Sequence, residues 1–139
     1  MTDPVEGEVW RYPYLWGWQD DRGETEGRKD RPTAIIAAVH DAQGQKHLFL
    51  LPLTTKPPHS RQNAVEVPVI EARRAGLTDS ERIWVVLDEY NYDLLQESVY
   101  FDPDGKIGRF SRTFSKKLLA VYGVILAKQK SRRINRRDI

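Results

Sequence analysis

Two apolar runs of strand length, separated by a short polar turn, constrain the fold of this chain more than any other feature. The first run, residues 34–39, is apolar at every position, and the second, residues 47–53, is nearly so. A strand that is apolar on both faces is normally buried on both, which places it inside a sheet. Asp41 and Gly44 between the runs are typical turn residues. We therefore expect two neighbouring central strands, at residues 33–39 and 47–53.

The remaining short elements follow from residue type and alternation. Strand-forming residues bounded by turn signals predict further strands, and a helical pattern that ends at Gly76 predicts a short helix. These expected elements are strands at 8–14, 64–67, 82–87 and 98–101, and one or two helical turns at 69–75.

One long helix is expected near the C-terminus, capped by Ser111 or Thr113 and fading near Lys130. Its apolar residues recur at helical spacing, which is typical of a helix with one buried face. This stripe consists of Phe114, Leu118, Val121, Tyr122 and Ile125. Five or six short strands with one such helix predict a mainly β fold, either a small, strongly bent barrel or paired sheets.

Composition limits the number of domains and the cellular context. At 139 residues the chain is expected to form one domain, covering residues 1–130. The chain has no cysteine, which excludes disulfides, thiolate metal sites and cysteine nucleophiles and suits a reducing cytoplasm. No signal peptide is expected from the N-terminal residues, and no apolar run approaches the roughly 20 residues that span a bilayer.

Cofactor-dependent chemistry finds no support in the sequence. The three histidines, His40, His47 and His59, are scattered, and none is paired with an acidic residue at metal-ligand spacing. No phosphate-binding loop, dinucleotide fingerprint or nucleophile elbow is present. We therefore expect neither a metal nor an organic cofactor.

Charge is unevenly distributed along the chain. Residues 112–139 contain nine lysines and arginines and one aspartate, a net charge of +8, whereas the preceding residues carry −6. Residues 131–139 are expected to form a basic, disordered tail. A basic tail on an acidic body favours a polyanion or an acidic protein as partner, and a frayed, solvated terminus is the alternative interpretation.

Two polar positions at strand ends are the main candidates for chemistry. Arg31 lies between a long charged loop at residues 15–30 and the first central strand, so its backbone is fixed while its guanidinium can reach a ligand. Thr54 follows the second central strand directly. A guanidinium and a hydroxyl on neighbouring strands are suited to bind a phosphate, since arginine offers a planar fork of donors and a permanent charge. We take Arg31 and Thr54 as the catalytic candidates.

The remaining candidates are expected to bind substrate. Trp18 in the long loop can stack on an unpaired base, and Lys29 precedes Arg31. His59 lies in the proline-rich loop after the threonines, where its imidazole can carry a proton. Thr55 offers a second hydroxyl beside that of Thr54. Glu89 and Asn91 follow the strand at 82–87; a carboxylate there can act as a base or clamp an arginine, and the amide can contact a base or ribose.

The order of several motifs resembles that of the MazF/PemK family of toxin ribonucleases, over about residues 5–128. The enlarged first loop and the Pro-Pro segment after the threonines are most similar to a PemK-like subgroup. The motifs that carry the resemblance are Gly7-Glu8-Val9-Trp10, Arg31-Pro32 before an apolar strand, Leu51-Pro52-Leu53-Thr54-Thr55, and Leu87-Asp88-Glu89.

The resemblance implies a fold, an activity and partners. The fold would be a small SH3-like barrel of the type that MazF, PemK and the gyrase poison CcdB share, assembled as a homodimer. The activity would be metal-independent cleavage of single-stranded RNA, in which the ribose 2′-hydroxyl attacks the adjacent phosphate and leaves a 2′,3′-cyclic phosphate. Arg31 would stabilise charge and serve as general acid or base partner, and Thr54 would hold the phosphate. A cognate antitoxin would cover the RNA groove.

One departure from the family leaves two other interpretations open. Many members have an arginine after the fifth strand, where this chain has Asn91. A second cationic group would then have to come from elsewhere, or the activity would be weak or lost. The alternative functions are a non-catalytic barrel that binds nucleic acid or a protein target, and a degenerate relative that keeps only the dimer and shows neither cleavage nor toxicity.

Overall fold

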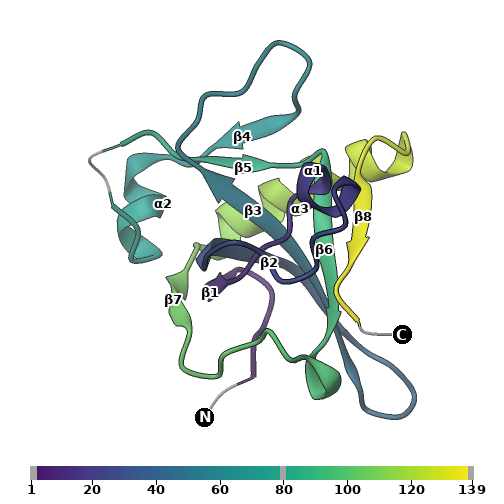
Figure 1. Ribbon diagram of the computed structural model, residues 1–139. Helices are drawn as coiled ribbons and strands as arrows, with labels where there is room; N and C mark the ends of the chain where they lie inside the picture. The colour runs from purple at the N-terminus through teal and green to yellow at the C-terminus, as the bar shows by residue number, and fades with distance from the viewer. Residues whose placement is uncertain (1–2, 79–80, 138–139) are drawn as a thin grey trace.

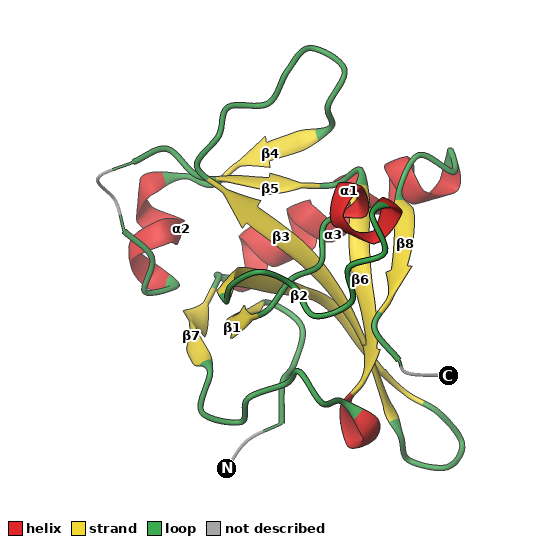
Figure 2. Cartoon of the chain, viewed as in Figure 1, coloured by secondary structure: helices red, strands yellow, loops and turns green. Residues whose placement is uncertain are grey.

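The computed structural model describes residues 3–78 and 81–137, and within these ranges the chain forms eight strands and three α-helices (Figure 2). The fold is mainly β, as the sequence predicts. The strands are β1 (Glu8–Tyr12), β2 (Arg31–His40), β3 (Lys46–Thr54), β4 (Ala64–Glu66), β5 (Trp84–Val86), β6 (Glu89–Leu94), β7 (Lys106–Arg109) and β8 (Arg132–Asn135). The helices are α1 (Gly17–Asp21), α2 (Val69–Arg74), α3 (Arg112–Ala127) and one 3-10 turn, η1 (Leu95–Glu97).

The two apolar runs form the antiparallel pair β2 and β3 at the centre of the sheet. Their register runs from Thr33 opposite Pro52 to His40 opposite Lys46, with a bulge between Ile35 and Ala37. On its other side β2 pairs with β1, which pairs in turn with β7. The prediction of two neighbouring central strands is therefore confirmed.

A bend in β3 gives the sheet its shape. Residues 47–50 of β3 pair with β6, whereas Leu53 and Thr54 pair with β5, which is followed by β4. β8 lies parallel to β6 on its outer side (Figure 1). The result is a strongly bent, barrel-like sheet that does not close, with β4 and β7 at the two ends of its main path.

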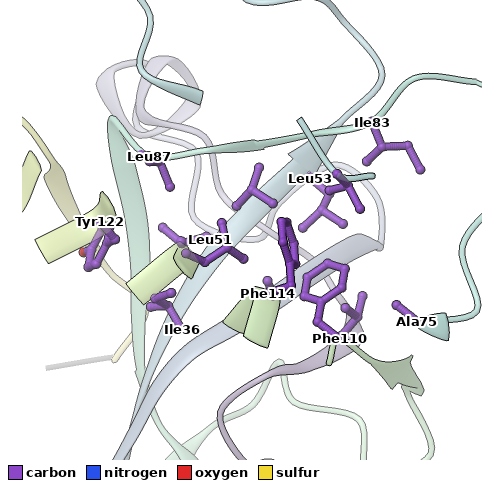
Figure 3. Close-up of a cluster of buried hydrophobic side chains, with 14 of the residues drawn as sticks. Ile36, Leu51, Leu53, Ala75, Ile83, Leu87, Phe110, Phe114 and Tyr122 are labelled. Carbon is purple, nitrogen blue, oxygen red and sulfur yellow. The ribbon is translucent and has the colours of Figure 1, made fainter. Parts of the chain in front are cut away.

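The main core lies between the sheet and α3 (Figure 3). Phe114, Leu118, Tyr122 and Ile125 of the predicted stripe are buried there, whereas Val121 is only partly buried. The Ser111 hydroxyl, and not that of Thr113, caps the helix by accepting from the Phe114 N–H at 3.1 Å. Within the described residues, no helix combines the length and apolar character needed to cross a bilayer.

A second buried cluster supports the loop between β1 and β2. Its members share aromatic or aliphatic side chains that alternate in sequence with those of the main core, so they occupy the other face of the strands. The cluster comprises Trp10, Tyr12, Tyr14, Ile35, Leu48 and Leu50, with Trp16 and Phe101 packed against it. This packing anchors the start of the β1–β2 loop, residues 13–30.

Two expectations about elements are wrong: the strand at 98–101 and the disordered tail. Residues 98–101 form no strand; the strands on either side of them are β6 and β7, which the sequence analysis missed. β6 reads as a polar run, yet its Asn91 and Asp93 are buried because partners distant in sequence bond them. The expected disordered tail is ordered through β8, where Ile134 is 1% exposed and fills the core. Its position directly beside β6 explains the order, because the strand pairing and this burial outweigh the repulsion among its arginines.

Candidate functional site

A groove of about 450 Å³ lies where the β1–β2 loop, the start of β2, the end of β3 and the β3–β4 loop (residues 55–63) meet. Both catalytic candidates, Arg31 and Thr54, line it. The strand register explains why: the antiparallel β2–β3 ladder ends with Thr33 opposite Pro52, and Arg31 and Thr54 each lie two residues beyond that pair, at the same end of the two strands. Thr33 and Pro52, as a directly opposed pair, share a face of the sheet, and positions two residues further along each strand return to that face, which directs Arg31 and Thr54 to one side.

Arg31 is half-buried, and its guanidinium has no carboxylate partner within residues 3–78 and 81–137. Burial lowers the pKa of Arg31 from its ordinary value. The guanidinium carbon lies 5.0 Å from the ring centroid of Trp16, within cation–π range. An arginine that is partly desolvated and lacks a counterion is suited to bind an anionic ligand in the groove.

The two threonines have different surroundings. Thr54 lines the groove, and its hydroxyl accepts a hydrogen bond from the Lys56 N–H at 3.1 Å. That bond uses a lone pair of the oxygen, so the O–H remains able to donate to a ligand. Thr55 is exposed and does not line the groove, so the structure does not bring this candidate to the site.

Glu89, the first residue of β6, supplies a carboxylate to the groove wall. Its Oε1 accepts from the Tyr14 hydroxyl at 3.1 Å and from the Gly17 N–H at 2.9 Å. Burial raises the pKa of Glu89, although these two hydrogen bonds and the nearby Arg132 act in the opposite direction. A half-buried carboxylate with a raised pKa is a candidate proton acceptor.

The rim of the groove carries an exposed aromatic ring between two arginines. Trp18 of α1 is 46% exposed, with the guanidinium carbons of Arg28 and Arg22 at 4.7 and 5.2 Å from its ring centroid. Lys29 and His59 are exposed and also line the groove. These contacts hold the ring in place and leave part of its surface open to stack on a planar ligand.

Asn91 does not reach the groove, and the expectation that it contacts substrate is wrong. It is fully buried: its Oδ1 accepts from the Leu15 N–H at 2.9 Å, and its Nδ2 donates to the Leu15 carbonyl at 2.8 Å. The same oxygen accepts from Arg136 at 3.0 Å. Asn91 therefore joins β6 to the β1–β2 loop and has no surface to offer a ligand.

Two cationic groove residues, Arg28 and Lys56, were missed by the sequence analysis, although each lies in a loop that already held a candidate. With Lys29 and Arg31 they make four cationic side chains, against the single carboxylate of Glu89. Arg28 is paired with Glu24 at 2.8 Å. The excess of positive charge suits a polyanionic ligand. No three histidine, aspartate or glutamate side chains in the described part of the chain are grouped so as to hold a metal ion.

Comparison with known proteins assigns this chain to no family. No protein-family model matches it, and a search of curated proteins gives no significant match. The features that bear on function are therefore the groove, its Arg31 without a carboxylate partner in the described residues, the neighbouring Thr54 and the half-buried carboxylate of Glu89.

Proposed function

We propose that this protein is an endoribonuclease of the MazF/PemK toxin type that cleaves single-stranded RNA in this groove. One observation carries the proposal: Arg31, half-buried and without a carboxylate partner among the described residues, shares the groove with Thr54, which lies at the same end of the β2–β3 pair. On this proposal the bent sheet is a variant of the SH3-like barrel of that family. The protein would act in the cytoplasm as a homodimer and would be inhibited by an antitoxin that fills the groove.

The proposed reaction is a transesterification within the RNA. The ribose 2′-oxygen attacks the adjacent phosphorus, the bond from phosphorus to the 5′-oxygen breaks, and a 2′,3′-cyclic phosphate and a 5′-hydroxyl result. Arg31 stabilises the charge that grows on the phosphate oxygens, and Thr54 donates its hydroxyl to one of them. Each interaction strengthens as the phosphorane forms, which is the requirement for lowering the barrier.

Proton transfer is assigned to two other groove residues. Glu89 accepts the 2′-hydroxyl proton, which its raised pKa favours. His59, exposed at the groove rim, donates a proton to the departing 5′-oxygen.

Substrate binding is assigned to the rim. Trp18 stacks on an unpaired base, while Arg28, Lys29 and Lys56 contact the flanking phosphates. Single-stranded RNA can bind to these rim residues because its bases can unstack and turn outward.

The test is cleavage of an unstructured oligoribonucleotide by the purified protein in EDTA. Arg31→Ala is expected to lower the rate about 100- to 1000-fold, the usual effect of removing a donor to the transition state. Thr54→Val, which keeps the shape and removes the hydroxyl, is expected to lower it as well. Arg74→Ala is the matched control, because Arg74 is an exposed arginine on α2, outside the groove lining. A wild type that cleaves no RNA would exclude this function.

A second function, binding of nucleic acid without cleavage, is favoured by one specific observation. The groove holds four cationic side chains, which serve binding as well as catalysis, while Asn91 stands where the family often has an arginine. On this alternative, RNA binding would survive Arg31→Ala nearly unchanged. It would weaken uniformly with salt, and no product would form.

A further inference from the structure

Arg136, just beyond β8, is the most completely enclosed arginine of the C-terminal segment, at 4% exposed. Its Nη1 donates to the Pro13 carbonyl at 2.7 Å and to Asn91 Oδ1 at 3.0 Å. Its Nη2 donates to the carbonyls of Thr25 and Glu26 at 3.2 and 3.3 Å. A buried charge is tolerated only where neighbouring groups replace its hydration, and here three backbone carbonyls and an amide oxygen do so for the two Nη groups, while Nε is buried without a hydrogen-bond partner among the described residues.

Aromatic rings complete the enclosure of this guanidinium. Its carbon lies 3.9 Å from the ring centroid of Tyr100 and 5.3 Å from that of Tyr12. The Tyr100 hydroxyl donates to the same Thr25 carbonyl at 3.1 Å. The charge is thus stabilised by π faces and carbonyl dipoles, and by no carboxylate of residues 3–78 and 81–137.

The carbonyls that Arg136 binds belong to both ends of the β1–β2 loop. Pro13 opens the loop, and Thr25 and Glu26 lie near its end, so a single guanidinium draws the two ends together. Gly27 comes next, with a φ of +77°, and an added Cβ there would lie 2.3 Å from the Pro13 carbonyl oxygen. Only glycine allows the returning chain to pass this close to Pro13.

The groove residues of this loop lie on either side of Gly27, the point where the returning chain passes Pro13. Trp18 precedes it, and Arg28, Lys29 and Arg31 follow Gly27 within four residues. β8 makes a second tie to the same loop, since Arg132 donates to Asp20 at 2.7 Å and to Asp21 at 2.9 Å (α1 and β8 in Figure 1). The position of the groove wall therefore depends on the C-terminal segment, here residues 132–136, which supplies both of these ties to the loop.

We propose that Arg136 is a positioning residue that holds the β1–β2 loop, and with it the cationic wall of the groove, in its working conformation. The proposal rests on the proposed function only for its effect on RNA cleavage. Its effect on the loop is independent of any activity. The C-terminal basic residues, which suggest an external polyanion in the sequence, thus serve an internal contact at Arg136.

The first test is limited trypsin digestion of the native protein, because the loop contains Arg22, Arg28 and Lys29 as cleavage sites. Arg136→Met is expected to raise the rate of cleavage in the loop at least tenfold at a temperature well below unfolding. Arg136→Lys retains the charge but cannot bind both ends of the loop at once. Its rate of cleavage in the loop is expected to lie between those of the wild type and Arg136→Met. Arg133→Met is the matched control: Arg133 is exposed on β8, and its guanidinium contacts the Tyr92 ring and not the loop.

Tyr100→Leu provides a second variant in case Arg136→Met fails to fold. Tyr100 is only partly buried, and the change removes one π face and the bond to Thr25. This variant is also expected to raise the rate of trypsin cleavage in the loop, by a smaller factor than Arg136→Met does. Loop cleavage unchanged in both Tyr100→Leu and Arg136→Lys would overturn the proposal.

The second readout is RNA cleavage, with KM and kcat measured separately. A misplaced wall is expected to raise KM at least tenfold in Arg136→Lys, with a smaller change in kcat than Arg31→Ala causes. An equal KM in wild type and Arg136→Lys would contradict the positioning role. If the wild type itself cleaves no RNA, the proposed function fails, and accelerated digestion of the loop in Arg136→Met still supports the positioning of the loop.

Discussion

At the scale of single residues, the groove depends on side chains whose environments differ from those of ordinary surface residues. Arg31 and Thr54 could be predicted from sequence because a strand end fixes a side chain, and antiparallel neighbours bring two such ends together. Asn91 could not, because its buried amide is matched by Leu15, 76 positions earlier, and by Arg136, 45 positions later. No local pattern in the sequence records pairings at such distances.

Glu89 gives the residue-scale prediction. Glu89→Gln retains an acceptor for Tyr14 and Gly17 and removes the proton acceptor, so cleavage is expected to fall at least about 100-fold. In the wild type, the acid limb of the pH–rate profile is expected above the ordinary glutamate value of 4.5, in the direction of the raised pKa. An acid limb at or below 4.5 would contradict the assignment of Glu89 as the base.

The same raised pKa has a consequence for stability, with a definite sign. A carboxyl whose pKa is higher in the folded state stabilises the fold when protonated, fully below the unfolded value and less as pH rises through the folded value. Glutamine is neutral throughout. The melting temperature of the wild type, compared with that of Glu89→Gln, is therefore expected to rise as the pH falls from above the folded-state pKa of Glu89 towards 4.5.

At the scale of elements, α3 joins the core to α2 through its first turn. Ser111 accepts from the Phe114 N–H, and its own N–H and hydroxyl donate to the Glu71 carboxylate at 2.8 and 2.7 Å. The helix itself was predictable from its apolar spacing. β8 was not predictable, because four residues with one apolar side chain, Ile134, resemble a solvated tail until β6 is placed beside them.

The capping contact gives the element-scale prediction. Ser111→Ala is expected to lower the free energy of unfolding by about 1–2 kcal/mol, since it leaves an N-terminal N–H of the helix and part of Glu71 without a partner. Thr113→Ala is the control, because Thr113 is exposed within the helix, and a change near zero is expected. Urea denaturation measures both, and equal losses in the two variants would contradict the cap assignment.

At the scale of the whole molecule, charge is separated between a cationic groove and a C-terminal segment whose arginines are used internally. Arg132 pairs with α1, Arg137 pairs with Glu97 at 3.3 Å, and Arg136 is buried. The net charge of +2 conceals this division. Attraction to a polyanion is therefore expected to come mainly from the groove, because these three C-terminal arginines already have partners within the chain.

Salt dependence of RNA binding gives the prediction at this scale. With about four groove cations on phosphates, the slope of log K against log salt is expected near −3, at about −0.7 for each contact on a single strand. Lys29→Ala and Lys56→Ala are each expected to reduce the slope by about 0.7. Lys117→Ala, on the exposed side of α3, is expected to leave it unchanged, and an equal reduction there would place the binding surface elsewhere.

The chemistry of the RNA ends tests the central claim most directly. Wild-type protein in EDTA would be given two oligoribonucleotides of the same sequence, one of which has a single 2′-deoxyribose at the mapped cleavage site. The proposed mechanism predicts a 2′,3′-cyclic phosphate and a 5′-hydroxyl from the all-ribose strand, and no cleavage at the deoxy position. Cleavage at that position, or products with a 5′-phosphate, would contradict attack by the 2′-hydroxyl.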